Sequence, residues 1–232
     1  MKSVFVTGTD TGVGKTVVAG LLGRYLRERG YRAITQKWVQ TGTRDYPCDI
    51  PAHLELMGVE RGTIERYGRD VNPYAFELAG SPHLAAACEG ARIDVRKIVG
   101  SFRRLEAAFD AVIVEGAGGV LVPLSKRKLL VDVVERLGLP VVVVAANKLG
   151  AINHTLLTVE ALRARGIEVL GIVFNTLDRR EDEVVVRDNP EIVKALARVP
   201  ILGQLPWSKD VGRLYRRFKP TGKKVLAGLS RT

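Results

Sequence analysis

Short apolar runs, rich in valine and isoleucine, recur along the chain and alternate with longer stretches of helical spacing. The runs start at residues 3, 32, 111, 141, 169 and 199, and several are apolar at successive positions. Such runs are typical of strands that are buried on both faces, as in parallel sheets. They predict a sheet that is covered on both sides.

Two of the intervening stretches carry apolar residues on one helical face. They span residues 15–30 and 152–166, and each ends in a glycine, as helices commonly do. The alternation predicts an α/β fold, a mostly parallel doubly wound sheet with helices on both faces and ligands at the carboxyl ends of its strands. We expect a single domain over residues 1–232, with an irregular, substrate-shaping insertion at residues 41–100 where turn residues interrupt the pattern.

Composition narrows the classes of protein without naming a reaction. Hydrophobic residues make up 46% of the chain, which argues against disorder. The net charge of +11 comes with no nucleic-acid recognition motif, so we interpret it as a solvated basic surface and expect no nucleic-acid partner. No apolar run is long enough for a membrane helix, no leader precedes the first run, and Cys48 and Cys88 lack metal-type spacing. We therefore expect a cytoplasmic protein with no membrane partner.

A phosphate-binding loop is predicted between the first strand and the first helix. The sequence FVTGTDTGVGKT, residues 5–16, ends like the G-x-x-x-x-G-K-[ST] motif, but Thr9 stands where the first glycine belongs and Gly8 lies one residue earlier. Backbone N–H groups of such a loop, together with the helix N-terminus, bind phosphate oxygens. Lys15 would contact the β and γ phosphates, and the Thr16 hydroxyl would ligate Mg²⁺.

Three further polar residues follow predicted strands and should lie near this loop. Lys37 ends the second strand and could hold an anion while it is phosphorylated. Glu115 ends the third strand before a glycine-rich turn and could complete a Mg²⁺ site. Asn175 ends a later strand, and its amide can both donate and accept, as recognition of a purine edge requires.

Five segments together resemble one family. GTDTGVGKT, KWVQTG, NPYAFELAGSPH, VEGAGG and LGQLPW, in that order, resemble dethiobiotin synthetase, and the resemblance runs from residue 3 to about residue 210. It implies a P-loop NTPase-like fold, the shifted loop glycine as a family trait, a homodimer, Mg²⁺ as cofactor and ATP as co-substrate. The implied reaction carboxylates 7,8-diaminopelargonate with CO₂ or bicarbonate and closes its ring, giving dethiobiotin, ADP and phosphate through a carbamate and a carbamic–phosphoric anhydride.

The resemblance also implies residue roles. Lys37 and Lys15 would be catalytic, and Thr16, Glu115 and an aspartate, either Asp49 or Asp45, would bind the metal. The implied nucleotide contacts are Gly12, Val13, Gly14, Lys15, Thr16, Val17, Asp49, Glu115, Gly116, Ala117, Gly118, Asn175, Thr176, Leu205, Pro206 and Trp207. The implied substrate contacts are Thr41 and, across the dimer interface, Gly150, Ala151, Ile152 and Asn153.

Two departures from the family pattern stand close to these residues. Trp38 replaces the usual proline after the lysine, which we expect to change the local turn, and Gly12 stands where some members carry a glutamate. We assign structural or substrate-positioning roles to His83 and His154, because the substrate amine can lose its proton to phosphate or water.

Two other functions are compatible with the loop. One is a regulatory or assembly ATPase, which is disfavoured because Asp10 stands where such switch proteins carry an early lysine. The other is an amide-forming ligase domain that acts on a corrinoid or a similar acid. Those chains usually continue into a glutaminase domain, for which this sequence offers no candidate cysteine nucleophile.

Overall fold

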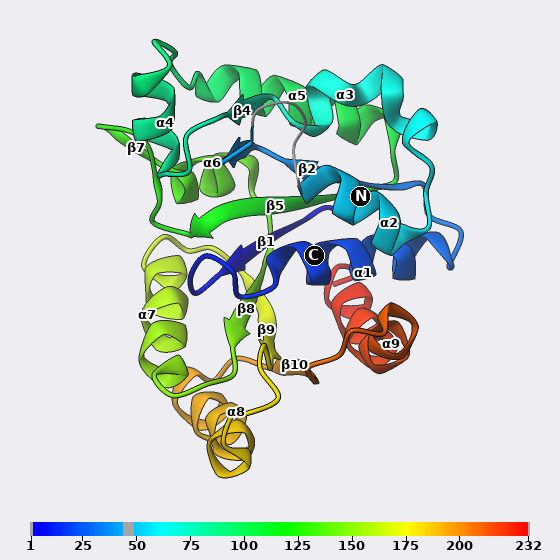
Figure 1. Ribbon diagram of the computed structural model, residues 1–232, viewed down its shortest axis with the longest axis vertical. Helices are drawn as coiled ribbons and strands as arrows, with labels where there is room; N and C mark the ends of the chain where they lie inside the picture. The colour runs from blue at the N-terminus through cyan, green and yellow to red at the C-terminus, as the bar shows by residue number, and fades with distance from the viewer. Residues whose placement is uncertain (1, 44–48, 232) are drawn as a thin grey trace.

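The computed structural model describes residues 2–43 and 49–231 and contains a six-stranded parallel sheet. Its strand order is β10-β9-β8-β1-β5-β2 (Figure 1). The strands are β1 (Val4–Gly8), β2 (Ala33–Lys37), β5 (Ala111–Gly119), β8 (Val141–Ala146), β9 (Val169–Asn175) and β10 (Ile201–Leu205). Each of the six apolar runs thus supplies one strand of the sheet.

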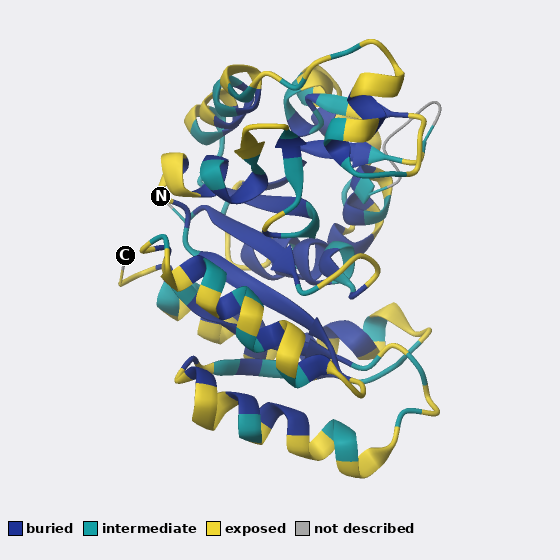
Figure 2. Cartoon of the chain, turned by 90° about the vertical axis from the view of Figure 1, so that its left-hand side faces the viewer, coloured by how far each residue is buried: buried dark blue, intermediate teal, exposed yellow. Residues whose placement is uncertain are grey.

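Helices cover both faces of this sheet, which confirms the predicted fold class. Helices α1 (Lys15–Arg27) and α9 (Val211–Gly228) pack on one face together with Val142 and Val144 of β8. On the other face, α5 (Val95–Ala108), α6 (Leu130–Leu137), α7 (Ala151–Arg163) and α8 (Glu183–Ala197) pack with Val143 and Ala145. The strands are buried along most of their length, whereas the helices keep exposed outer faces (Figure 2).

The two helices predicted to end at Gly30 and Gly166 end a few residues earlier. Helix α1 ends at Arg27 and α7 at Arg163. Gly30 and Gly166 follow with φ of 83° and 64°, and the N–H of each donates to the carbonyl of that last helical residue at 2.9 Å. The glycine therefore closes the final turn, as predicted, although the regular helix ends before it. Within the described ranges no helix has the length and apolar character needed to cross a membrane.

The segment at residues 41–100 is more regular than its turn-rich sequence predicts. Its described part contains α2 (Asp49–Met57), a 3₁₀ helix η1 (Arg61–Tyr67), α3 (Gly68–Val71), β4 (Tyr74–Phe76), α4 (Pro82–Cys88) and the first turns of α5. Strand β4 pairs in parallel with β3 (Val39–Thr41), and β6 (Pro123–Ser125) pairs with β7 (Lys128–Leu129) after β5.

Side-chain hydrogen bonds fasten this segment to the carboxyl end of β2. Asn72 Nδ2 donates to the Lys37 carbonyl at 2.8 Å, and Gln36 Nε2 donates to the Asp70 carbonyl at 2.8 Å. The N–H of Gly42 donates to the Leu78 carbonyl at 3.1 Å, which extends the β3–β4 pairing. The segment is therefore positioned beside the phosphate-binding loop.

Candidate active site

The phosphate-binding loop joins β1 to α1 and adopts a conformation that needs its glycines. Gly12 and Gly14 have φ of 73° and 97°, in the left-handed region that other residues rarely adopt. A Cβ on Gly8 would lie 2.8 Å from the carbonyl oxygen of Asp10. The loop thus turns tightly from Gly8 onward, and Gly8, the glycine that lies one residue earlier than in the standard motif, leaves room for the Asp10 carbonyl.

Lys15 lies inside this loop. Its Nζ donates to the backbone carbonyl of Asp10 at 2.8 Å. Burial of the ammonium, helped by the positive charge of Lys37, lowers the pKa of Lys15 to about 8, although nearby carboxylates act in the opposite direction. A phosphate group here would supply the anionic partner that the buried ammonium needs.

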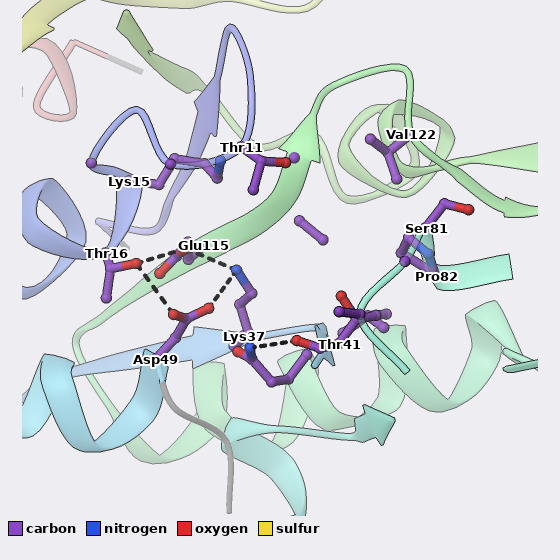
Figure 3. Close-up of a pocket in the computed structure, with 18 residues that line it drawn as sticks. Thr11, Lys15, Thr16, Lys37, Thr41, Asp49, Ser81, Pro82, Glu115 and Val122 are labelled. Atoms are coloured by element: carbon purple, nitrogen blue, oxygen red, sulfur yellow. Dashed lines mark hydrogen bonds and ion pairs between the residues drawn. The ribbon is translucent and has the colours of Figure 1, made fainter. Parts of the chain in front are cut away.

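Lys37 and Glu115 meet because β2 and β5 are neighbours in register. The two residues are partners in the parallel ladder, where Lys37 is the last residue of β2 and Glu115 is the middle residue of β5. Lys37 Nζ lies 2.8 Å from Glu115 Oε1 and 2.8 Å from Asp49 Oδ2 (Figure 3). It also donates to the Gly116 carbonyl at 3.0 Å. The lysine therefore bridges two carboxylates from different elements.

Burial and charge act in opposite directions on this cluster. Burial alone would favour the neutral forms, but the adjacent carboxylates outweigh it and raise the pKa of Lys37. Burial likewise opposes ionisation of Glu115, yet Lys37 and then His53 hold its pKa down at about 2. Lys37 and Glu115 are thus both ionised near neutral pH.

Thr16, Asp49 and Glu115 provide the oxygen atoms expected around Mg²⁺. Thr16 Oγ1 lies 3.2 Å from Glu115 Oε1 and 3.4 Å from Asp49 Oδ1, so a hydroxyl and two carboxylates converge (Figure 3). Mg²⁺ in nucleotide sites commonly takes one or two carboxylates, with phosphates and water completing its shell. This donor set fits the ion, and Lys37 already places a positive charge between the two carboxylates. Among the described residues no group of three or more His, Cys, Asp or Glu side chains forms an all-protein metal cage.

A cavity of about 660 Å³ unites most of these residues. Across from the loop and Lys37, its wall is formed by Thr41, Ser81, Pro82 and Val122 (Figure 3). The predicted site residues that line it are Gly12, Gly14, Lys15, Thr16, Lys37, Thr41, Asp49, Glu115, Ala117 and Gly118. Predicted phosphate, metal and substrate contacts therefore share one space.

The residues predicted to bind the base lie at a second cavity, of about 860 Å³. Thr176, Pro206 and Trp207 line it, and the Arg179 guanidinium lies 5.1 Å from the centre of the Trp207 ring. Asn175 is buried beside the loop instead, and its Nδ2 donates to the Val13 carbonyl at 3.0 Å.

Several predicted residues line neither cavity. Val13, Gly116 and Leu205 are buried, and Val17 is partly buried beside the core. The predicted dimer-interface residues begin α7, where Gly150 is the N-cap with φ of 87°, Ala151 is buried, Ile152 is half-buried and Asn153 is exposed.

The remaining candidates lie away from the cavity or outside the described residues. His83 Nδ1 lies 3.0 Å from Ser81 Oγ, and His154 is exposed on α7. Asp45, the alternative metal ligand, lies outside the described residues, as does Cys48. Cys88 is exposed and free.

Thr11, Gln40 and Ser81 line the cavity but are missing from the sequence-based set, and so are two residues that hold Glu115 and Lys37 by hydrogen bonds. His53 Nε2 lies 2.7 Å from Glu115 Oε2, and Asn72 holds the Lys37 carbonyl. His53 follows Asp49 by four residues in α2, the spacing that puts two side chains on one helical face, so the sequence contained this signal. Asn72 begins the NPY motif, but only the fold brings that motif to β2.

Trp38 is a buried anchor beneath the site. Its side chain is 0% exposed, its indole N–H donates to Gln36 Oε1 at 2.9 Å, and its ring centre lies 5.0 Å from that of Phe5. A Cβ on Gly116 would lie 2.7 Å from the Phe5 ring, so the glycine leaves room for this packing.

Comparisons with known proteins agree with the geometry. A family model described as an AAA domain matches residues 2–214. An ATP-dependent dethiobiotin synthetase from Chlorobaculum tepidum is 41% identical over 226 residues, covering 94% of each chain. One from Anaeromyxobacter dehalogenans (strain 2CP-C) is 42% identical and covers 93% of this chain and 95% of its own.

Solved structures with the same fold are more distant in sequence. They include the cell division ATPase MinD of Pyrococcus furiosus, with a TM-score of 0.58, 15% identity and coverage of 98% of this chain and 99% of its own. The pNOB8 ParA structure has a TM-score of 0.62 and 12% identity, with coverage of 99% of each chain. At this identity the likeness concerns the fold alone.

Proposed function

Because this chain belongs to the ATP-dependent dethiobiotin synthetase family, we propose that it carboxylates 7,8-diaminopelargonate and closes its ring at the expense of Mg·ATP. The products are dethiobiotin, ADP and phosphate. One observation carries the proposal beyond the family name: a single cavity joins the phosphate-binding loop to Lys37 and to the wall of Thr41, Ser81 and Pro82. ATP phosphates and a small acceptor can meet only in such a shared space.

The chemistry consists of three steps that need positioning more than a side-chain nucleophile. One substrate amine adds to CO₂ and loses a proton, which gives a carbamate. A carbamate oxygen then attacks the γ-phosphorus, and the bond to ADP breaks. The neighbouring amine attacks the carbonyl carbon of the anhydride and gives up a proton to the departing phosphate or to water. The bond between that carbon and the phosphate oxygen breaks, so the ring closes and phosphate leaves. Holding both amines on one molecule makes the last step intramolecular, which can be worth roughly 7 to 11 kcal/mol.

Lys37 and Lys15 stabilise the negative charge in these steps. Lys37 lies on the cavity wall between the loop and Thr41, where its ammonium can hold a carbamate oxygen. Lys15 can turn from the Asp10 carbonyl to the β and γ phosphates. Thr16, Asp49 and Glu115 would hold Mg²⁺, which would neutralise phosphate charge. The γ-phosphoryl group would therefore have a positive charge on the side of Lys15 and another on the side of Lys37.

The adenine site is proposed at the second cavity, beside Pro206 and Trp207. An aromatic ring and a proline offer flat apolar surfaces to a base, and Asn175 ties this region to the loop through Val13. The two cavities together would accommodate an extended nucleotide whose phosphates reach Lys15.

A homodimer is proposed in which the start of α7 reaches the substrate of the partner. Leu149 is 84% exposed and Leu157 is 61% exposed, so apolar surface flanks Gly150 to Asn153. Light scattering at micromolar concentration tests this directly, and a monomer mass would contradict it.

The function is tested by measuring ADP release with Mg·ATP and bicarbonate, in the presence and absence of 7,8-diaminopelargonate. Turnover should require the diamine, and the product should carry one added carbonyl carbon from ¹³C-bicarbonate. Diamine-independent ADP release would instead favour a regulatory or assembly ATPase. Release that depends on a different acid and on ammonia would favour the amide-ligase alternative.

A further inference from the structure

We infer that His53 is a positioning residue that orients Glu115, so that one carboxylate oxygen of Glu115 is kept for Mg²⁺ and Lys37. This role rests on the proposed metal site, since it concerns how that site is held. His53 itself is completely buried and does not line the cavity, so it cannot contact the reacting atoms. Its action must pass through the carboxylate that it contacts.

The two oxygens of Glu115 have different partners. Oε1 lies 2.8 Å from Lys37 Nζ and 3.2 Å from Thr16 Oγ1, so it faces the cavity. Oε2 lies 2.7 Å from His53 Nε2 on the opposite side. Because an ionised carboxylate only accepts hydrogen bonds, Nε2 carries the hydrogen. This bond fixes the rotation of the carboxylate and therefore the direction of Oε1.

The buried imidazole ring of His53 makes a favourable polar contact with Glu115 through Nε2. Within residues 2–43 and 49–231, His53 Nδ1 has no hydrogen-bond partner. A buried nitrogen without a partner is unfavourable, and an apolar side chain such as leucine would avoid that penalty at this position. Simple core packing therefore does not account for an imidazole here, whereas a donor for Glu115 does.

Helix α2 supplies both Asp49 and His53, which gives the contact a second effect. Asp49 begins the helix and meets Lys37, and His53 lies one turn later and meets Glu115. Residues four apart lie on the same face of a helix. The His53 bond therefore ties α2 to β5 next to the site and fixes the separation of the two carboxylates. Loss of this bond should loosen both metal ligands together.

The test compares His53→Leu, His53→Gln and Leu54→Ala in the full-length protein. Leu54 is the neighbouring buried residue of α2 and belongs to the core, so its truncation loosens the helix without removing a donor to Glu115. ADP binding is measured by calorimetry with Mg²⁺ and again with EDTA. The ratio of the two affinities isolates the contribution of the metal from nucleotide binding as a whole.

For His53→Leu we expect that ratio to fall about 10- to 100-fold, the usual effect of losing a partner of a metal ligand. ADP affinity in EDTA should stay unchanged. His53→Gln keeps an N–H donor of similar reach and should recover most of the ratio. Leu54→Ala should leave the ratio at the wild-type value even if its melting temperature falls.

Three results would overturn the inference. The first is a wild-type ratio in His53→Leu, and the second is an equal fall in His53→Leu and Leu54→Ala, which would mean a merely structural role. A third is no Mg²⁺ effect in the wild-type protein, which would refute the proposed metal site together with the role of His53. The first two results leave the proposed reaction intact, so the two failures are distinguishable.

Discussion

Replacing Lys37 by methionine should destabilise the protein in a way that Mg²⁺ can partly reverse. The side chain is only 6% exposed and lies between the carboxylates of Asp49 and Glu115 at 2.8 Å each. Methionine retains the length of the side chain and removes the charge. The two carboxylates would then face each other in a largely buried site, with no cation between them.

The size of the effect follows from these distances. At an effective dielectric of about 20, each pair attracts by roughly 6 kcal/mol, and desolvation of the ions offsets a large part of that. Removing one partner of a buried pair typically costs about 3 to 5 kcal/mol, since the remaining charge is left unmatched. For a domain of this size, 1 kcal/mol corresponds to roughly 2 to 4 °C, so Tm should fall by about 6 to 20 °C.

Mg²⁺ bound at the proposed site would supply the missing positive charge, and this provides a specific assay. Thermal unfolding is followed by calorimetry or fluorescence with EDTA and with Mg²⁺, without nucleotide. Mg²⁺ should raise the Tm of Lys37→Met more than that of the wild type, where the lysine competes for the same two carboxylates. Lys126→Met, at an exposed lysine between β6 and β7, is the matched control and should leave Tm unchanged in both buffers.

The same variant tests the role of Lys37 in catalysis. Turnover should fall at least about a hundredfold while nucleotide binding persists, because contacts to a developing anion are worth roughly 2.7 to 4 kcal/mol. The reasoning is refuted if the Tm of Lys37→Met equals that of the wild type in EDTA. It is also refuted if Mg²⁺ stabilises both proteins equally.

Three further predictions concern the loop and the packing beneath the site. The pKa of Lys15 is about 8 without ligand, and phosphate raises it, so nucleotide affinity should fall as pH rises through 8 and binding should take up a proton. Calorimetry in buffers of different ionisation enthalpy measures this uptake, which Lys15→Met should abolish. Gly116→Ala places a Cβ 2.7 Å from the Phe5 ring and should cost about 1 to 3 kcal/mol in urea unfolding, whereas Gly68→Ala, with no neighbour within 4 Å, should cost nothing. Trp38→Ala removes a fully buried ring and should cost about 3 to 5 kcal/mol by the same measurement, and a loss below about 1 kcal/mol would contradict its role as an anchor.

The strands could be predicted because their burial leaves a local signature. A strand covered by helices on both faces is apolar at successive positions, and β8 (Val141–Ala146) is buried at every residue. The order β10-β9-β8-β1-β5-β2 leaves no such signature, since strands that are far apart in sequence become neighbours. Helices α2 and α4 were not predicted, because these short helices follow turn-like residues and depend on tertiary contacts.

The candidate site was predictable to the same extent. Lys37, Glu115 and Asn175 each end an apolar run, and a parallel sheet gathers such ends at one edge. The spacing of Asp49 and His53 indicated one shared helical face, but the contacts with Glu115 and Lys37 were not predictable, because they depend on the order of the strands and on the placement of the insertion. His53 and Asn72 act only through contacts that the folded insertion makes with β2 and β5.

The register of β2 links the apolar core to the chemistry proposed for the cavity. Successive residues of extended chain point to opposite faces, so Lys37, the last residue of β2, and Trp38, which follows it, lie on opposite sides of the sheet. Trp38 packs against Phe5 in the core on the face covered by α5 to α8, which leaves Lys37 on the face of α1 and opposite Glu115. A slip by one residue would move Trp38 to the face of α1, away from Phe5, and would turn the ammonium of Lys37 away from both carboxylates. The packing of Trp38 on one face thus fixes the position of the Lys37 ammonium on the other face. The two adjacent residues Lys37 and Trp38 therefore link the core to the site.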